Sequence, residues 1–232
     1  MIIFHGMDFE AAAAVTIKDI YVSPIQRKVV VRERPIQAGA DFVRVTDGTR
    51  TVKITFSLLE QDPYKRQEQI EAVTAWADTK QPAPMSLPYH RGKLLDVLCD
   101  NLPAPSAREW WESSLTLTFT AFDPYFYDEF DRSIACGTAF FVGGNAPPKM
   151  RIERTLSADA NNQAYSDGAD TMTFSTIPTG AMVIDLNRQT AQVGATSIMQ
   201  YFSLLSTFIL PKTGSMTITG TGTVKWRERW TA

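Results

Sequence analysis

Cysteine and histidine are scarce in this sequence, and each scarcity excludes a class of function. Only two cysteines, Cys99 and Cys136, occur in 232 residues, too few for a disulfide framework or a four-ligand zinc site. We expect both to be small buried apolar side chains. The two histidines, His5 and His90, offer little for a nucleophile and base pair, and His90 stands between a proline and a glycine, as in a turn. The sequence therefore predicts no enzyme, no metal site and no cofactor.

Long apolar runs and a large charge of one sign are missing as well. No run of 18 apolar residues occurs, which predicts a soluble protein without a membrane span, and Glu10 interrupts the stretch where a signal peptide would be apolar. The formal net charge is −2, so neither half is basic enough to neutralise a run of phosphates. We therefore expect no specific binding of nucleic acid.

Charge and chain breakers divide the sequence into two parts. Residues 1–132 hold 15 Lys or Arg and 19 Asp or Glu, whereas residues 133–232 hold 8 and 6. A concentration of glycine and proline over residues 136–148 coincides with this change. The sequence predicts two domains, residues 1–132 and 133–232.

The first part has the pattern of an α+β domain. Residues 51–58 alternate strictly, with Val52, Ile54 and Phe56 on one face. Residues 115–122 alternate in the same way, and further strands are expected at residues 15–21, 28–32, 42–46 and 94–99. One helix is predicted from the N-cap Asp62 to about Thr79, and its apolar stripe is expected to cover the sheet.

The second part has the pattern of a β-sandwich. Strands are expected at residues 149–154, 171–175, 182–186, 190–193, 206–210, 215–219 and 223–230. In the last of these, Glu228 is the one charged residue on the apolar side. Residues 220–223 are expected to connect a hairpin, and residues 159–170 to form a polar hairpin loop rather than a calcium loop.

Several segments together resemble the siphophage distal tail protein family. Residues 39–60 are followed by a capped helix that carries a tryptophan, and the alternating strand at 115–122 ends in Asp123-Pro124-Tyr125. In that family an aromatic strand closed by Asp-Pro-Tyr ends the first domain. The second half is similar more weakly, through Gly143-Gly144-Asn145, the strand at residues 182–186 and a last strand rich in Arg and Trp.

The resemblance implies a mainly β protein, with a tail-tube-like β-sandwich bearing one packed helix and then a galectin-like β-sandwich. It also implies a structural virion protein that forms a six-fold ring, or two stacked rings, at the distal end of the tail tube. The implied partners are further copies of the chain, the tail tube protein, the tail-tip protein and the receptor-binding protein. DNA would pass through the ring without specific binding, and the chain would be made in the cytoplasm of the host bacterium.

A closed ring of identical subunits needs a heterologous interface, for which a projecting hairpin is suited. Our candidate is residues 34–50, with polar ends at Arg34 and Arg50 and an apolar centre at Ile36, Phe42, Val43 and Val45. We hypothesise that these apolar groups are buried between subunits. A hairpin that packs within its own domain is the competing interpretation.

Two other functions remain open from the sequence. Exposed aromatic side chains of the sandwich would suit a carbohydrate-binding module, and Trp110, of opposite strand parity to Trp111, is a candidate in the first part. A tail tube or tail-completion protein with an appended domain is the second alternative. Tube proteins polymerise into long stacks, whereas distal tail proteins stop at one or two rings.

Overall fold

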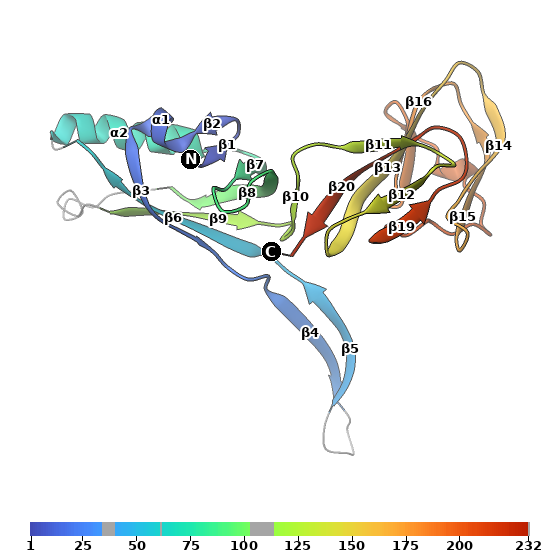
Figure 1. Ribbon diagram of the computed structural model, residues 1–232, viewed down its shortest axis with the longest axis horizontal. Helices are drawn as coiled ribbons and strands as arrows, with labels where there is room; N and C mark the ends of the chain where they lie inside the picture. Colours follow the sequence, from blue (N-terminus) through green and yellow to red (C-terminus); the bar gives the residue numbers. More distant parts are fainter. Residues whose placement is uncertain (34–39, 61, 103–113, 232) are drawn as a thin grey trace. The chain divides into compact units, whose positions relative to one another are not determined.

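The protein is described by a computed structural model over residues 1–33, 40–60, 62–102 and 114–231. The chain separates into two compact units, Met1–Phe126 and Tyr127–Thr231, here called unit 1 and unit 2. The fold is mainly β, as predicted (Figure 1). The division falls within β10 (Phe126–Asp128), ahead of the glycine- and proline-rich residues 136–148. Those residues contribute to β12 and β13 of unit 2.

The strands of unit 1 form an antiparallel sheet that bends through β8. Their order across the sheet is β3 (Val15–Val22), β6 (Arg50–Leu58), β9 (Leu115–Ala121), β8 (Lys93–Asn101), β7 (Ala83–Ser86), β1 (Ile3–Phe4) and β2 (Met7–Asp8). One half of β8 pairs with β7 and the other half with β9. The turn between β7 and β8 holds His90 at a hairpin tip, as predicted.

The alternation predicted for the central strands is confirmed. Val52, Ile54 and Phe56 of β6 are fully buried, and Leu117 and Phe119 of β9 lie beside them in the same core. The residues between them point to the opposite face of the sheet. One face of this sheet is therefore core and the other is polar.

Helix α2 (Pro63–Ala77) covers the apolar face of the sheet (Figure 1). It begins as predicted, because the carboxylate of Asp62 accepts a hydrogen bond from the Tyr64 amide at 2.9 Å. The short helix α1 (Phe9–Ala13), which the sequence pattern did not predict, packs against α2. Trp76 joins both helices to the sheet, with ring centroids 4.3 Å from Phe9 and 6.1 Å from Phe119.

Unit 2 is built from one larger antiparallel sheet and two two-stranded sheets. The larger sheet has the order β18 (Thr196–Ser197), β17 (Thr190–Val193), β16 (Gly180–Asp185), β13 (Ala146–Leu156), β20 (Thr223–Trp230) and β11 (Arg132–Ala135). The smaller sheets pair β12 (Ala139–Val142) with β19 (Gly214–Thr217), and β14 (Ala160–Ser166) with β15 (Thr171–Ile177). A short 3-10 helix, η1 (Met199–Tyr201), precedes β19.

Side chains from these sheets share one core, which makes unit 2 a sandwich. Ile152 of β13 and Val224 of β20 are fully buried together with Phe174 of β15. Glu228, the charged residue on the apolar side of the last strand, is buried at 5% exposure. Its carboxylate accepts the Gly143 amide at 2.9 Å and pairs with Arg132 at 2.9 Å, so the buried charge is compensated.

Three predictions for unit 2 were wrong. Residues 206–210 form no strand; their chain instead follows β15 through isolated backbone bonds such as Thr207 N to Thr171 O, 3.1 Å. Residues 220–223 connect no hairpin, because β19 pairs with β12 while β20 pairs with β13 and β11. The stretch 159–170 is mostly strand β14, and only its last residues form the turn.

The glycine pair that precedes β13 is required by close packing. Gly144 has φ +83°, and a Cβ there would collide with the carbonyl oxygen of Arg229. Asn145 beside it closes the end of the last strand, accepting the Thr231 amide at 2.7 Å. The Gly-Gly-Asn motif thus holds the C-terminal end of β20.

Replacement of Gly144 with Ala is expected to destabilise unit 2 by about 3 kcal/mol. An alanine at this positive φ is strained, and the backbone at Arg229 must also move to make room for its Cβ. Gly137→Ala is the matched control, since Gly137 has a similar φ of +88° but no atom lies near the place that a Cβ would take. We expect this variant to lose only about 1 kcal/mol of the free energy of unfolding. Equilibrium urea unfolding measures both. Equal losses would show that the close contact with Arg229 is unimportant.

Asp131 ties two strands of unit 2 together on the outer side of the sheet. Its carboxylate accepts hydrogen bonds from Arg151 of β13 and Arg227 of β20. Burial alone raises the pKa of Asp131, but the hydrogen bonds and charges of the two arginines outweigh it and lower the pKa below its usual value.

Because this carboxyl group has a lower pKa in the folded protein than in the unfolded one, its stabilisation is present above about pH 4. It is lost as the pH falls through the folded-state pKa. Asp131→Asn should lower the free energy of unfolding by about 1–3 kcal/mol at pH 7 and by much less near pH 2, in urea titrations at the two pH values. Glu129→Gln, at an exposed neighbour, is the control, and a loss for Asp131→Asn that does not vary with pH contradicts this account.

Candidate functional site

The hairpin of β4 (Arg27–Glu33) and β5 (Ala40–Asp47), here called the arm, carries a group of exposed apolar side chains. The two strands form a sheet of their own (Figure 1). The ladder between β3 and β6 ends at Val22 and Val52, and the ladder of the arm begins at Arg27 and Asp47. The arm is therefore a two-stranded extension beyond the packed sheet.

A β-bulge gathers apolar side chains on one face of the arm. Val29 lies opposite Val45, and Val31 lies opposite Phe42. Phe42 and Val45 are three residues apart and would face opposite sides of a regular strand. The register shift between Val30 and Val31 leaves Val43 as an extra residue and restores Phe42 to the face of Val45.

These side chains form the apolar face of the arm. Each of them keeps 47–65% of its surface exposed: Val29, Val31, Phe42, Val43 and Val45. An exposed apolar row of this kind is typical of a contact surface. The sequence analysis missed Val29 and Val31, although the run Val29-Val30-Val31 in a predicted strand was a usable signal.

The opposite face of the arm is basic. Lys28 and Arg32 of β4 alternate with the apolar residues of that strand, and Arg44 of β5 lies opposite Val30. All three cations are exposed. One face of the arm therefore suits apolar burial and the other suits water or an acidic surface.

The residues of the predicted interface fall into three groups. Phe42, Val43 and Val45 lie on the exposed arm. Arg34 and Ile36 lie outside the described residues, as do Trp110 and Trp111. Arg50 is the first residue of β6 and is only 3% exposed. The interface considered below therefore leaves Arg50 out.

Arg50 instead packs inside unit 1 against the end of the first domain. Its guanidinium carbon lies 5.0 Å from the centre of the Phe126 ring, and the imidazole of His90 stacks on the same ring at 4.1 Å. Burial lowers the pKa of Arg50. Burial, followed by the charges of Lys93 and Arg50, also lowers the pKa of His90. These groups hold Phe126 in place.

The Asp123-Pro124-Tyr125 motif lies at the base of the arm. Pro124 is buried and Asp123 and Tyr125 are half-buried. The Tyr125 hydroxyl donates a hydrogen bond to the Asp47 carboxylate at the end of β5. Asp47 also pairs with Arg27 at the start of β4, with Nε and Oδ1 3.2 Å apart.

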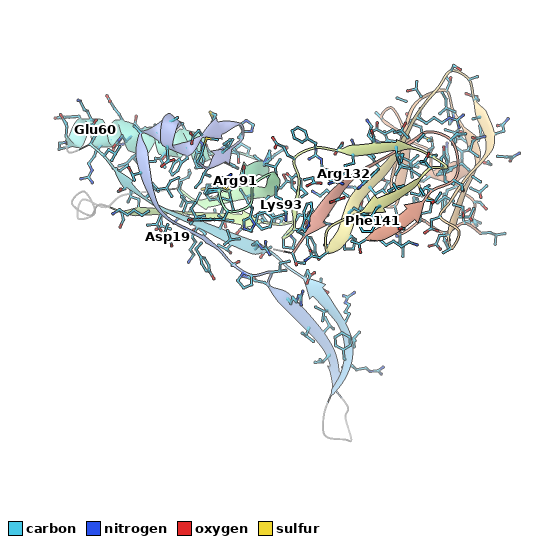
Figure 2. All side chains as sticks on the ribbon, in the orientation of Figure 1. Asp19, Glu60, Arg91, Lys93, Arg132 and Phe141 are labelled. Atoms are coloured by element: carbon cyan, nitrogen blue, oxygen red, sulfur yellow. The ribbon has the colours of Figure 1, made fainter. Side chains whose placement is uncertain are left out.

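The polar face of the sheet in unit 1 is rich in threonine. Cross-strand pairs on β6 and β9 join Thr51 with Thr120 and Thr55 with Thr116. The hydroxyl oxygens of Thr55 and Thr116 are 3.2 Å apart. Asp19 of β3 lies on the same face opposite Thr55 (Figure 2). This face offers hydroxyl groups and few charges.

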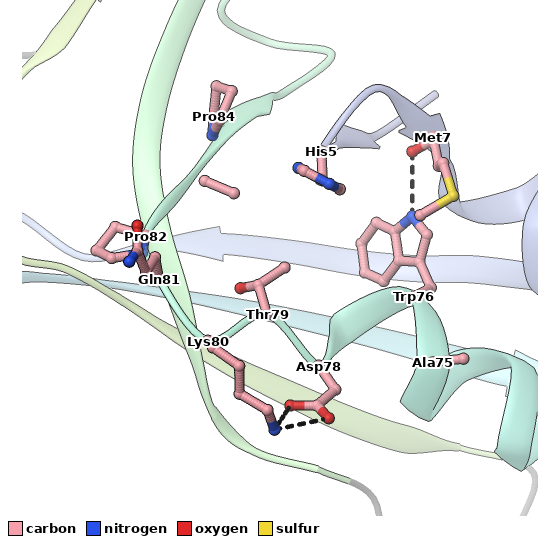
Figure 3. Close-up of a pocket in the computed structure, with 11 residues that line it drawn as sticks. His5, Met7, Ala75, Trp76, Asp78, Thr79, Lys80, Gln81, Pro82 and Pro84 are labelled. Atoms are coloured by element: carbon pink, nitrogen blue, oxygen red, sulfur yellow. Dashed lines mark hydrogen bonds and ion pairs between the residues drawn. The ribbon is translucent and has the colours of Figure 1, made fainter.

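A recess of about 560 Å³ lies beside the end of α2, and two of the polar groups that line it are already paired (Figure 3). The indole Nε1 of Trp76 donates to the Met7 carbonyl at 3.0 Å, and Asp78 pairs with Lys80 at 2.9 Å. Trp76 is 2% exposed, so its ring offers no stacking platform for a sugar.

Across the described ranges, no group of three or more His, Cys, Asp or Glu side chains is placed to hold a metal ion. Among the helices of those same ranges, none has the length and apolar character needed to cross a membrane. Cys99 and Cys136 are half-buried rather than fully buried as expected, and burial raises the pKa of both thiols, which favours their protonated form.

Comparison with solved structures identifies the fold. The chain matches the Dit protein of phage SPP1 with a TM-score of 0.74 and 14% sequence identity, over 98% of both chains. That protein is described as a paradigm of the hub adsorption apparatus in phages that infect Gram-positive bacteria. The chain therefore has the fold of the SPP1 Dit protein, in both of its units.

Chains in two structures of the phage P2 baseplate, with Ca and with Sr, match more distantly. Their TM-scores are 0.41 and 0.40, at 10% and 11% identity over 92% of this chain and 90% of theirs. No protein-family model matches the sequence, and no curated protein matches it. The likeness to the SPP1 protein is therefore one of fold, at a sequence identity of 14%.

Because the apolar face of the arm is already exposed, its substitution should leave unit 1 folded. We expect Phe42→Asp with Val43→Asp to change the free energy of unfolding by no more than about 0.5 kcal/mol. Phe56→Ala, at a fully buried ring, should cost about 3–5 kcal/mol. Thermal and urea unfolding of the monomer measure both, and a large loss for the arm variant would mean that the arm packs within its own domain.

Proposed function

We propose that this chain is the structural hub at the distal end of a phage tail, where it joins the tail tube to the tail tip. The observation that carries this proposal is the match to SPP1 Dit over 98% of both chains. Such a match supports a protein of the same architecture, with both domains kept. It agrees with the resemblance of the Asp123-Pro124-Tyr125 region to the distal tail protein family.

In this proposal six copies close into a ring through the arm. A cyclic ring uses a heterologous contact, in which one surface of a subunit meets a different surface of the next. The apolar face of the arm, centred on Phe42, Val43 and Val45, packs against the neighbouring subunit. Covering its five half-exposed side chains is worth on the order of 4–8 kcal/mol per arm before the entropic cost of association.

The polar face of the sheet in unit 1 then lines the channel for DNA. Its hydroxyl groups and the acidic Asp19 and Asp100 give DNA no basic stripe to bind. Lys53 on β6 is an exposed cation on this face. A weakly acidic wall lets a polyanion slide without being held.

The remaining roles follow from a structural hub. The chain acts without catalysis, and it is located at the tail tip of the virion after synthesis in the cytoplasm of the bacterial host. Its partners are the tail tube protein and the tail-tip protein, and the ring joins them to the receptor-binding apparatus. In this proposal the ring-forming domain is residues 1–132 and the galectin-like domain is residues 133–232.

The mass and shape of the purified particle test the proposal. Light scattering should give about 155 kDa for one ring of six 25.9 kDa chains, or twice that for two stacked rings, and electron microscopy should show six-fold rings. Phe42→Asp with Val43→Asp should leave monomers, while Tyr89→Phe, at an exposed ring, should leave the rings intact. Long tubes would favour a tail tube protein instead, and rings unchanged by the arm variant would contradict the role of the arm.

A further inference from the structure

We propose that Tyr125 is a positioning residue for the arm: through Asp47 and Arg27 it fixes the direction in which the arm leaves unit 1. The relevance of this direction to ring assembly rests on the proposed function. The direction itself is a property of a single chain, and so it can be measured independently of any assembly.

The base of the arm is a break between two ladders. Four residues, Ser23–Gln26, separate β3 from β4, and Gly48–Thr49 separate β5 from β6. Three backbone hydrogen bonds cross the break, from the Ser23 amide to the Thr51 carbonyl, from the Gln26 amide to the Thr49 carbonyl and from the Gly48 amide to the Gln26 carbonyl. These bonds join the two strands of the ribbon to each other and do not tie the ribbon to a third element. A two-stranded ribbon with such a base can bend relative to its sheet unless another element holds it.

Tyr125 comes from a third element and reaches this base. Asp47 and Arg27 form the first register pair of the arm. The two carboxylate oxygens of Asp47 are divided between Arg27, on the partner strand of the arm, and the Tyr125 hydroxyl, from the chain after β9. One carboxylate thus connects both strands of the arm to the body of unit 1.

The residues on both sides of Tyr125 are buried, which restricts where its side chain and hydroxyl can lie. Pro124 before it is buried and has a restricted φ angle. Phe126 after it is 1% exposed, with the Arg50 guanidinium and the His90 ring both against it. The motif therefore sends Phe126 into the core and Tyr125 to the arm. This gives a physical reason for an aromatic pair directly after Asp-Pro.

The first experiment measures the direction of the arm in the monomer. Spin labels are attached at Thr46→Cys on the arm and Thr116→Cys on β9, both exposed positions, in a background with Cys99→Ala and Cys136→Ala. Electron spin resonance at low protein concentration then gives the distribution of distances between the labels. Wild type should give one narrow distribution.

Tyr125→Phe removes only the hydroxyl and should broaden or shift this distribution, and Asp47→Asn should do the same. Tyr89→Phe, at an exposed tyrosine of unit 1, is the matched control and should leave it narrow. Far-UV circular dichroism and urea unfolding report whether each variant is folded. A distribution for folded Tyr125→Phe that equals wild type overturns the proposal, as does a broad distribution for wild type itself.

The second experiment connects direction to assembly. If rings form, Tyr125→Phe should raise the protein concentration at which half of the chains are in rings by about tenfold or more, the effect of one hydrogen bond to a charged group. If Phe42→Asp with Val43→Asp abolishes rings while Tyr125→Phe assembles like wild type, the arm interface stands and the positioning role fails. If no variant affects rings, the proposed function of the arm fails, and the spin-label result alone decides the role of Tyr125.

Discussion

An apolar face on a two-stranded hairpin cannot be stabilised by the hairpin itself. Two strands offer no second layer to cover Phe42 and the valines around it, so these side chains stay in water in the isolated chain. The bulge at Val43 enlarges the exposed apolar face, because it turns Phe42 to the same side as Val45. The structure of unit 1 thus keeps one surface ready for burial while its own core is complete around Trp76. The role in assembly that we propose accounts for this combination.

Much of the fold follows from local patterns that the sequence already displays. Strict alternation located the central strands β6 and β9, and the Asp62-Pro63 pair located the start of α2. The shortest elements, β1, β2 and α1, have two to five residues, too few for a period to be recognised. The wrong strand at residues 206–210 has a different cause: Ile209 is buried in the core of unit 2, but its segment makes only isolated backbone bonds to β15 and no ladder.

The candidate site was predictable only in part, for reasons of three-dimensional contact. Phe42, Val43 and Val45 could be named because they are apolar residues inside a segment with polar ends. Arg50 shares the segment but lies over Phe126, a contact between residues far apart in sequence that no local pattern encodes. The link from Tyr125 to Asp47 is of the same kind. The Asp-Pro-Tyr motif marked the position, while its connection to the arm required the structure.

The central claim, that another copy of the chain covers the apolar face of the arm, is tested most directly by finding which surface contacts Phe42. A photoreactive phenylalanine analogue at position 42 can be crosslinked in a mixture of ¹⁴N- and ¹⁵N-labelled copies, and mass spectrometry then separates links within a chain from links between chains. The account predicts crosslinks between chains, from the arm of one copy to unit 1 of another. Crosslinks confined to single chains would contradict it.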